Sequence, residues 1–124
     1  MLPVTVTNAE EGESCPVRNV LVKVSGKWPC LIILTLEDGA MRFGALKRTI
    51  GDITQRVLTE NLRSLERDGY LTRTVHSGSP VAVSYELTRL GEDLLTVMKD
   101  LVAFASESYP AVTEARKAYD LSRK

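Results

Sequence analysis

The chain has 124 residues, of which 44% are hydrophobic and 26% are charged, and its formal net charge is zero. This length and composition predict one globular domain with a modest core, and the overall charge gives no sign of a nucleic-acid partner. The most apolar stretch, Cys30 to Leu36, is too short to cross a bilayer, and the N-terminus lacks the pattern of a signal peptide. We therefore expect a cytoplasmic protein without a membrane partner, whose two cysteines are reduced.

The charge is unevenly distributed along the chain. Residues 1–15 contain three glutamates and no basic residue, whereas residues 39–76 contain seven basic and four acidic side chains and so carry a net charge of +3. Local positive charge can steer a polyanion even when the whole chain is neutral. Residues 39–76 are therefore the candidate region for nucleic-acid binding.

The N-terminal part of the chain predicts a flexible segment followed by a helix. Residues 1–13 show no periodic pattern, and Ser14 then caps a helix with Cys15 and Pro16 in its first turn. Apolar residues at helical spacing form one stripe: Val17, Val20, Leu21 and Val24. Ser25-Gly26 ends this helix.

A second helix is predicted to start near Lys27 and to end at Asp38-Gly39. It is apolar on nearly every side, which predicts the buried central helix; these residues are Leu31, Ile32, Leu34 and Leu36. We expect Cys30 to be an inert core residue. Trp28 is interpreted as a packing anchor, and a ligand pocket beside it is the alternative.

Two further helices follow, joined by a tight turn. After an extended segment at Ala40-Met41, a helix is predicted over residues 42–50, and Gly51-Asp52 forms the turn. The next helix covers residues 52–69. Two amphipathic helices joined by a glycine turn predict a helix-turn-helix.

The helix over residues 52–69 has two different faces. Thr54 is placed to cap its start, and Gly69 follows its last turn. One face is a mostly apolar stripe: Val57, Leu58, Asn61, Leu62 and Leu65. The opposite face is polar: Arg56, Thr59, Glu60, Arg63 and Arg67. A solvated helix face has the same pattern, but these groups also suit the base edges of a DNA major groove.

The major-groove candidates are Arg56, Thr59, Glu60 and Arg63. Arginine donates in a fork to guanine, and glutamate can accept from cytosine or position a neighbouring arginine. Gln55, at the start of the helix, is a candidate for a phosphate or an adenine contact.

Beyond Gly69 the pattern changes to period two. Residues 70–77 and 81–87 alternate as two strands, and Gly78-Ser79-Pro80 forms the tip between them. A two-stranded hairpin is marginal alone, but directly after a helix-turn-helix it forms the wing of a winged helix. The predicted fold class is mainly α with a small β-hairpin wing.

Several basic side chains flank the predicted recognition helix. We interpret Arg42, Lys47 and Arg48, on the preceding helix, as phosphate clamps that set register without specifying sequence. Arg73 and His76, on the first wing strand, are candidates for DNA backbone contacts.

The C-terminal part predicts a long helix from Thr88, which is its cap, to about Ser108. We expect residues 14–108 to form the DNA-binding domain together with its dimerisation helices. Its apolar stripe is wider than one small core needs: Leu90, Leu94, Leu95, Val97, Met98, Leu101, Val102 and Phe104. A monomer would leave this stripe exposed, so we predict a homodimer. Tyr109-Pro110 is predicted to interrupt the helix, and residues 109–124 form a short terminal helix associated with the dimer.

No pattern in the chain predicts catalysis or a metal site. Cys15, Cys30 and His76 lack the spacing of zinc ligands, and the chain has neither a phosphate-binding glycine loop nor a nucleophile motif. We expect no enzyme, no metal and no cofactor.

Three stretches resemble HxlR-type transcriptional regulators. Their opening is similar to the first stretch, CPVRNVLVKVSGKWPCLIILTL. Their helix-turn-helix is similar to the second, RFGALKRTIGDITQRVLTENLRSLERDGYLTR. The end of their wing and the helix after it are similar to the third, VSYELTRLGEDLL. The match runs from about Cys15 to Phe104. This resemblance implies a winged-helix homodimer that binds operator DNA, with the first and the long C-terminal helices in the dimer interface.

The chain departs from these regulators at the wing. Members usually have a basic residue near the tip and a glutamate before the tyrosine, where this chain has Ala82 and Ser84. The tip carries no lysine or arginine, so a minor-groove arginine contact is not predicted. Some members use a cysteine at the place of Cys15 as a redox or electrophile sensor, and a helix N-terminus favours a thiolate. Packing near the dimer interface is the alternative role.

Together these patterns predict a homodimeric transcription regulator that binds a roughly palindromic operator on double-stranded DNA, with half-sites about 10 base pairs apart. A small molecule or an oxidant acting on a thiol is the expected effector. The alternative is a winged-helix module for protein–protein contact without specific DNA binding, which the neutral total charge and the uncharged wing tip favour.

Overall fold

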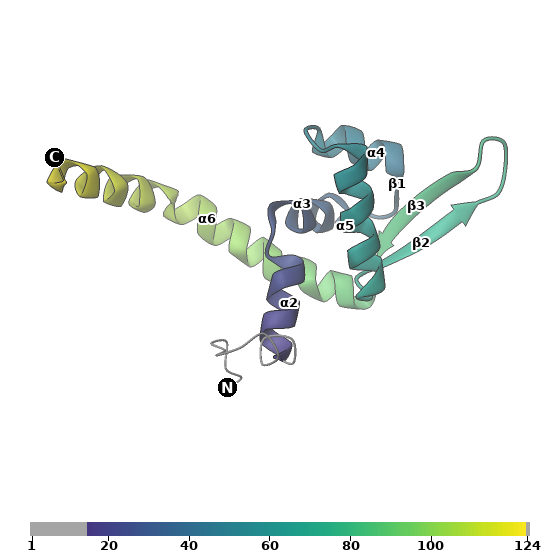
Figure 1. Cartoon of the computed structure of the whole chain (residues 1–124), viewed down its shortest axis with the longest axis horizontal. Coiled ribbons are helices and arrows are strands. Elements are labelled where there is room, and N and C mark those ends of the chain that lie inside the picture. Colours follow the sequence, from purple (N-terminus) through teal and green to yellow (C-terminus); the bar gives the residue numbers. More distant parts are fainter. Residues whose placement is uncertain (1–14, 124) are drawn as a thin grey trace.

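The computed structural model of the protein describes residues 15–123. Its elements, in chain order, are α2 (Pro16–Val24), α3 (Lys27–Thr35), β1 (Met41–Arg42), α4 (Phe43–Ile50), α5 (Gln55–Arg67), β2 (Leu71–His76), β3 (Ala82–Leu87) and α6 (Arg89–Ser122). The β2–β3 hairpin and the C-terminal half of α6 project in opposite directions from the helices between them (Figure 1). The predicted class, mainly α with a small β wing, is confirmed.

The core lies where α3, α4 and α5 meet the base of the sheet. Its fully buried side chains are Ile32, Ile33, Leu36, Leu46, Leu58, Leu62 and Leu65. Each contributes roughly 1.5–3 kcal/mol by leaving water. Helix α3 contacts α4, α5 and α6, so it is the central helix that its apolar sequence predicted.

Both ends of α5 form as the sequence predicted. Thr54 is the N-cap, and its side-chain Oγ1 accepts from the Val57 N–H at 3.2 Å. Gly69 follows the C-cap with φ +87°, and the Tyr70 N–H donates to the Leu65 carbonyl at 2.9 Å. That last bond closes a Schellman motif, which requires a left-handed residue at the glycine position. The caps therefore determine where the helix ends and the wing begins.

The sheet has three antiparallel strands in the order β1-β3-β2, one more than the predicted hairpin. Met41 lies opposite Tyr85, and Arg42 lies opposite Ser84. Two extended residues before α4 pair with the open edge of β3 and satisfy its backbone groups. Arg42 is therefore a strand residue and the N-cap of α4, with φ −75° and ψ 155°, and the prediction that it lies on the helix was wrong.

Alternation along the wing strands separates side chains onto two faces of the sheet. Arg73 lies opposite Tyr85, and His76 lies opposite Ala82. Residues separated by an odd number point to opposite faces of a strand. Arg73 and His76 therefore lie on different faces, although the sequence grouped them together.

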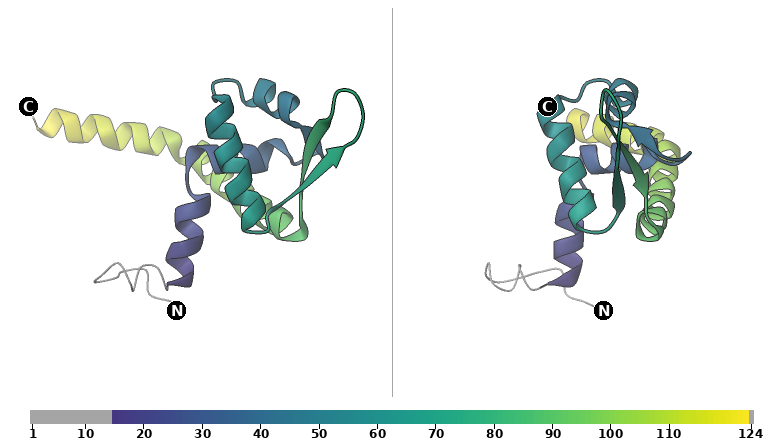
Figure 2. Two further views of the ribbon diagram at one scale, coloured as in Figure 1. Left: turned by 45° about the vertical axis from the view of Figure 1, so that its right-hand side comes forward. Right: turned by 90° about the vertical axis from the view of Figure 1, so that its right-hand side faces the viewer.

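Helix α6 runs without interruption through 34 residues, with Pro110 inside it (Figure 2). The predicted break at Tyr109-Pro110 and the separate terminal helix were wrong. A proline removes one N–H and costs about 3 kcal/mol in a helix interior. Both Pro110 and Ser106, whose carbonyl loses its donor, are exposed, so water can satisfy that oxygen. Alanines 111, 115 and 118 favour continuing the helix.

The start of α6 packs tightly on the turn between α5 and the wing. Thr88 is its N-cap, as predicted, and its Oγ1 accepts from the Gly91 N–H at 3.1 Å. The Thr88 N–H donates to the Tyr70 carbonyl at 3.0 Å. A Cβ on Gly91 would lie 2.2 Å from that same oxygen, so only glycine allows this approach.

Helix α2 begins one residue later than predicted. Cys15 is its N-cap, with φ −78° and ψ 114° and without a side-chain capping bond, and Pro16 is the first helical residue. The predicted cap Ser14 and the predicted flexible segment 1–13 lie outside the described residues. Within residues 15–123, no helix is both long and apolar enough to cross a membrane.

Candidate nucleic-acid interface

Helix α5 buries one face and exposes the other, as its sequence predicted. Leu58, Leu62 and Leu65 are buried, and Val57 and Asn61 are half-buried. The polar Asn61 fits this stripe because its Nδ2 donates to the Val57 carbonyl at 2.8 Å. The opposite face is therefore held in position by a rigid, well-packed scaffold.

The outward face of α5 carries the predicted base-reading residues. Gln55, Arg56, Glu60 and Arg63 are exposed, and Thr59 is half-buried. The Arg56 Nε donates to the Glu60 Oε1 at 3.1 Å, across one helical turn. These two side chains are 87% and 60% exposed, so water screens the pair, which contributes little to stability.

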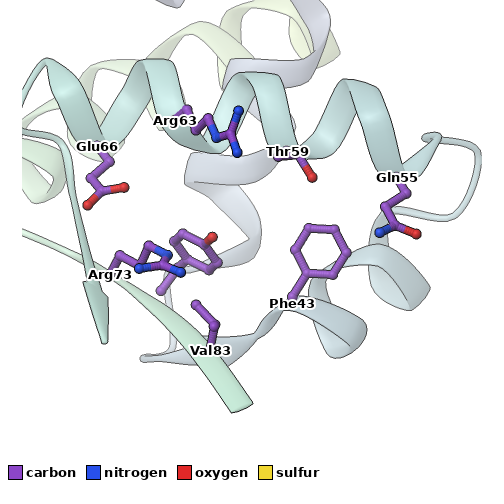
Figure 3. A pocket seen from close by; sticks show the side chains of 8 residues that line it. Phe43, Gln55, Thr59, Arg63, Glu66, Arg73 and Val83 are labelled. Carbon is purple, nitrogen blue, oxygen red and sulfur yellow. The ribbon is translucent and has the colours of Figure 1, made fainter. Parts of the chain in front are cut away.

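A cleft of about 440 Å³ lies between α5 and the wing. Its lining residues come from α4, α5, β2 and β3: Phe43, Gln55, Thr59, Arg63, Glu66, Arg73, Val83 and Tyr85. Figure 3 shows the α5 side chains along one wall, with Phe43, Arg73 and Val83 facing them. Four predicted DNA-contact residues, from two elements, therefore meet in one hollow.

Two arginines and one glutamate set the charge of this cleft. Arg63 comes from α5 and Arg73 from β2, and Glu66 lies one turn beyond Arg63. Neither arginine forms an ion pair among the residues that the structure describes. Their guanidinium groups therefore keep their donors for an anion that enters between helix and wing.

The other predicted contacts lie outside this cleft. Lys47 and Arg48 are in the last turn of α4, half-buried and exposed respectively. Arg42 lies on the sheet face that also carries Ser84 and His76, away from Arg73. The His76 Nε2 and Ser84 Oγ are hydrogen-bonded at 2.7 Å. The structure therefore brings Gln55, Thr59, Arg63 and Arg73 together in the cleft. The six other predicted contacts do not line it: Arg42, Lys47, Arg48, Arg56, Glu60 and His76. Whether any of them contacts DNA stays a prediction.

Four cleft residues were not among the predicted contacts: Phe43, Glu66, Val83 and Tyr85. Glu66 follows Thr59 by seven residues on α5, so a helical wheel places it beside Thr59. Val83 and Tyr85 share the face of Arg73 through the strand pairing, which depends on knowing the register. Phe43 is half-buried, packs against the core and also lines the cleft.

The two cysteines belong to different elements, Cys15 to the start of α2 and Cys30 to α3, and form no disulfide within residues 15–123. Cys15 is buried at the start of α2. Cys30 packs half-buried against the core, and burial raises the pKa of its thiol. This environment disfavours a reactive thiolate at Cys30. No group of three or more His, Cys, Asp or Glu side chains in the described part of the chain is arranged to hold a metal ion.

A helix-turn-helix with an exposed polar recognition helix, followed by a three-stranded wing, defines a winged-helix DNA-binding protein. Comparison with known families agrees, because the model of the HxlR-like helix-turn-helix family matches residues 23–113. The chain belongs to that family, and it is a DNA-binding transcriptional regulator.

Similar proteins share both the sequence and the fold. The HTH-type transcriptional regulator YdeP of Bacillus subtilis (strain 168) is 38% identical over 116 residues, which cover 91% of each chain. The solved structure of the transcriptional regulator ytfH from Salmonella typhimurium is 36% identical, covers 85% of this chain and 94% of that one, and has a TM-score of 0.77. The redox regulator HypR in its reduced form is 32% identical, covers 80% of this chain and 98% of that one, and has a TM-score of 0.74.

Proposed function

We propose that this protein is a homodimeric regulator that places α5 in the major groove of operator DNA. The observation that carries the proposal is the exposed face of α5 next to a cleft with two unpaired arginines, Arg63 and Arg73. The major groove of B-DNA is about 12 Å wide and admits one helix. Because the N-terminal residues of a recognition helix contact base edges, Arg56 and Thr59 are the proposed base readers, and Glu60 accepts a hydrogen bond from Arg56 beside them.

In this arrangement the cleft holds the DNA backbone. A phosphate between α5 and the wing would accept from Arg63 on one side and Arg73 on the other, with Gln55 as a neutral donor. We assign Arg63 to this phosphate more readily than to a base, because its neighbour across the cleft is the wing. His76 lies on the opposite sheet face and takes no part in the cleft.

The remaining basic residues are secondary phosphate contacts in this proposal. Lys47 and Arg48 lie in the last turn of α4, before the turn that leads into α5, and Arg42 is the N-cap of α4. Phosphate contacts of this kind fix the register of the protein on the duplex without reading sequence.

The second half of the proposal is the dimer. Large apolar side chains on α2 and α6 are exposed in one chain: Val20, Leu21, Val22, Leu90, Val97, Leu101, Val102, Phe104, Tyr109, Val112, Tyr119 and Leu121. A soluble monomer rarely exposes so many large apolar side chains on two helices. A second copy would cover it through a two-fold interface, which places the two α5 helices in successive major grooves, with half-sites about 10 base pairs apart.

The dimer can be tested by adding charge to this surface. Leu101→Glu and Phe104→Glu, at positions 60% and 66% exposed, should yield monomers with an intact fold. Val81→Glu at the wing tip, 63% exposed, is the matched control and should remain a dimer. Light scattering coupled to size exclusion measures the mass. A wild-type monomer would refute this half of the proposal.

An oxidant or another electrophile is the proposed effector, acting in the cytoplasm on Cys15. This thiol is the N-cap of α2, a helix that carries part of the exposed apolar surface. A change at Cys15 would therefore act on the dimer rather than on α5 directly. The similar protein HypR is a redox regulator, which supports a thiol-based signal.

Selection of bound fragments from random DNA, with and without oxidant, tests operator binding and the effector together. Binding to the selected site should weaken steeply with salt. Arg63→Gln and Arg73→Gln should each weaken binding to all sequences and reduce the salt slope by about 1. Arg89→Gln on α6 removes the same charge elsewhere and should leave the slope unchanged. Binding that ignores salt would refute the proposal.

The alternative function is a protein–protein interaction module. One observation favours it: the wing tip, residues 77–81, carries no charged side chain. Failure to bind any duplex at low ionic strength would support this alternative over operator binding.

A further inference from the structure

We propose that Glu60 is a specificity-determining residue that holds the Arg56 guanidinium in position to read guanine. This inference rests on the proposed function. The base is guanine, and the group that reads it is the Arg56 guanidinium. Glu60 would act through Arg56 rather than touch the DNA itself.

The geometry of the pair leaves a complete fork available. The Glu60 Oε1 accepts from the Arg56 Nε, which is only one of five guanidinium N–H donors. The four donors on the two terminal nitrogens remain, and two of them suffice for the O6 and N7 acceptors of guanine. Because the bond is to Nε, it fixes the plane of the group without blocking its outer edge.

The position of Arg56 on the helix supports base reading by this residue. Arg56 is the second residue of α5, and recognition helices contact base edges near their N-termini. Its side chain is 87% exposed, so no packing against the protein restricts it apart from the bond to Glu60. A long exposed arginine otherwise loses much rotamer freedom when it binds, and prior positioning reduces that loss.

The other arginines on this surface provide a contrast. Arg63 and Arg73 line the cleft and have no acidic partner within the described residues. A phosphate presents several acceptor oxygens and tolerates many approaches, whereas a base edge accepts one orientation. An acidic partner is therefore useful to a base-reading arginine and of little use to a phosphate-binding one.

The presence of a carboxylate on a DNA-facing helix needs a compensating benefit. A negative side chain near the phosphates lowers affinity for every sequence by repulsion. Since the exposed pair contributes little to folding, its benefit has to come from another source. Fixing the orientation of Arg56 supplies that benefit as discrimination between bases.

The test compares the full-length protein with Glu60→Gln, Glu60→Ala, Arg56→Ala and the double variant on the selected operator and all its single-base-pair changes. Glu60→Ala should lose discrimination at the same base pair as Arg56→Ala. A bidentate contact supplies about 5- to 150-fold discrimination, and the loss in Glu60→Ala should be part of that factor. Glu60→Gln should lose less, because its amide oxygen still accepts from Nε. Both should bind non-operator DNA more tightly at low salt.

The double variant separates positioning from direct reading. If Glu60 acts through Arg56, the double variant has the same base preferences as Arg56→Ala alone. A loss at a different base pair, additive with that of Arg56→Ala, would mean that Glu60 accepts from cytosine itself and would overturn the proposal.

Asp93→Ala is the matched control. It breaks the Arg89–Asp93 pair on α6, which has the same one-turn spacing and side chains 88% and 64% exposed. Its base preferences should equal those of the wild type, and a change equal to that of Glu60→Ala would overturn the proposal. Unaltered preferences in Glu60→Ala would overturn it while leaving operator binding intact. A wild type without any sequence preference would overturn both.

Discussion

Replacing Gly91 by alanine should disrupt the junction between the wing and α6. Gly91 lies in the first turn of α6, where a Cβ would come within 2.2 Å of the Tyr70 carbonyl oxygen. Real contacts to a Cβ stay beyond 3.0 Å, so helix and turn have to separate by at least the difference of 0.8 Å. The obstacle is backbone and cannot rotate away as a flexible side chain would.

The expected cost follows from what that separation breaks. Crowding a packed interior costs about 1–3 kcal/mol. Moving α6 also stretches the Thr88 N–H bond to the Tyr70 carbonyl, and an unsatisfied buried group costs about 1–3 kcal/mol. The better helix propensity of alanine offsets at most about 1 kcal/mol of this destabilisation. The free energy of unfolding of Gly91→Ala should therefore fall by about 1–5 kcal/mol.

Urea unfolding followed by circular dichroism, at one fixed protein concentration, measures this change. Gly44→Ala is the matched control, because Gly44 also lies in the first turn of a helix and its Cβ would meet only the end of the Arg48 side chain, at 3.2 Å. That variant should be neutral or slightly stabilised. Equal stability of Gly91→Ala and the wild type would refute the close approach of α6 to the turn.

Two further predictions concern single contacts. Thr54→Ala removes the hydroxyl that accepts from the Val57 N–H and should destabilise the protein by about 1 kcal/mol, whereas Thr54→Ser should keep the cap. Chemical unfolding measures both variants. A free energy of unfolding of Thr54→Ala equal to that of the wild type would show that the cap contributes nothing. The ion pair between Lys99 and Glu37 connects α6 to the end of α3, and the hydrogen bond and the charge of Glu37 raise the pKa of Lys99 above 10.5. Its contribution should therefore be complete below pH 10.5 and disappear as the pH rises through the raised value. The stability difference between wild type and Lys99→Met, followed through that range, should shrink to zero, and a difference that persists would contradict the assignment.

The sequence predicted the helices well because their signals are local. Thr54 and Gly69 flank α5, and both caps formed as expected. The apolar stripe of α5 was predicted in full, down to Asn61, whose amide bonds back to its own helix. Caps and helical periodicity depend on neighbours within a few residues, so one sequence is enough to find them.

Features that depend on distant partners were not predictable in the same way. Met41 and Arg42 became a strand only because β3 offers an open edge, and nothing near them in the chain signals that partner. Pro110 was predicted to interrupt the helix, because a proline usually does so. The exposure of the Ser106 carbonyl to water, which makes the proline tolerable, depends on the tertiary structure. Arg63 and Arg73 meet across the cleft through tertiary packing, so the sequence predicted both residues but not their pairing around one hollow.

The register of the wing restricts how its length can change. Leu71 and Arg73 share a face with Tyr85, whereas His76 lies on the other one. One extra residue inserted between Leu71 and Arg73 would turn the following strand over and withdraw the guanidinium from the cleft without touching any helix. Insertions in β2 or β3 are therefore compatible with the present surface only in even numbers. The exposed tip at residues 77–81 is free of that parity rule.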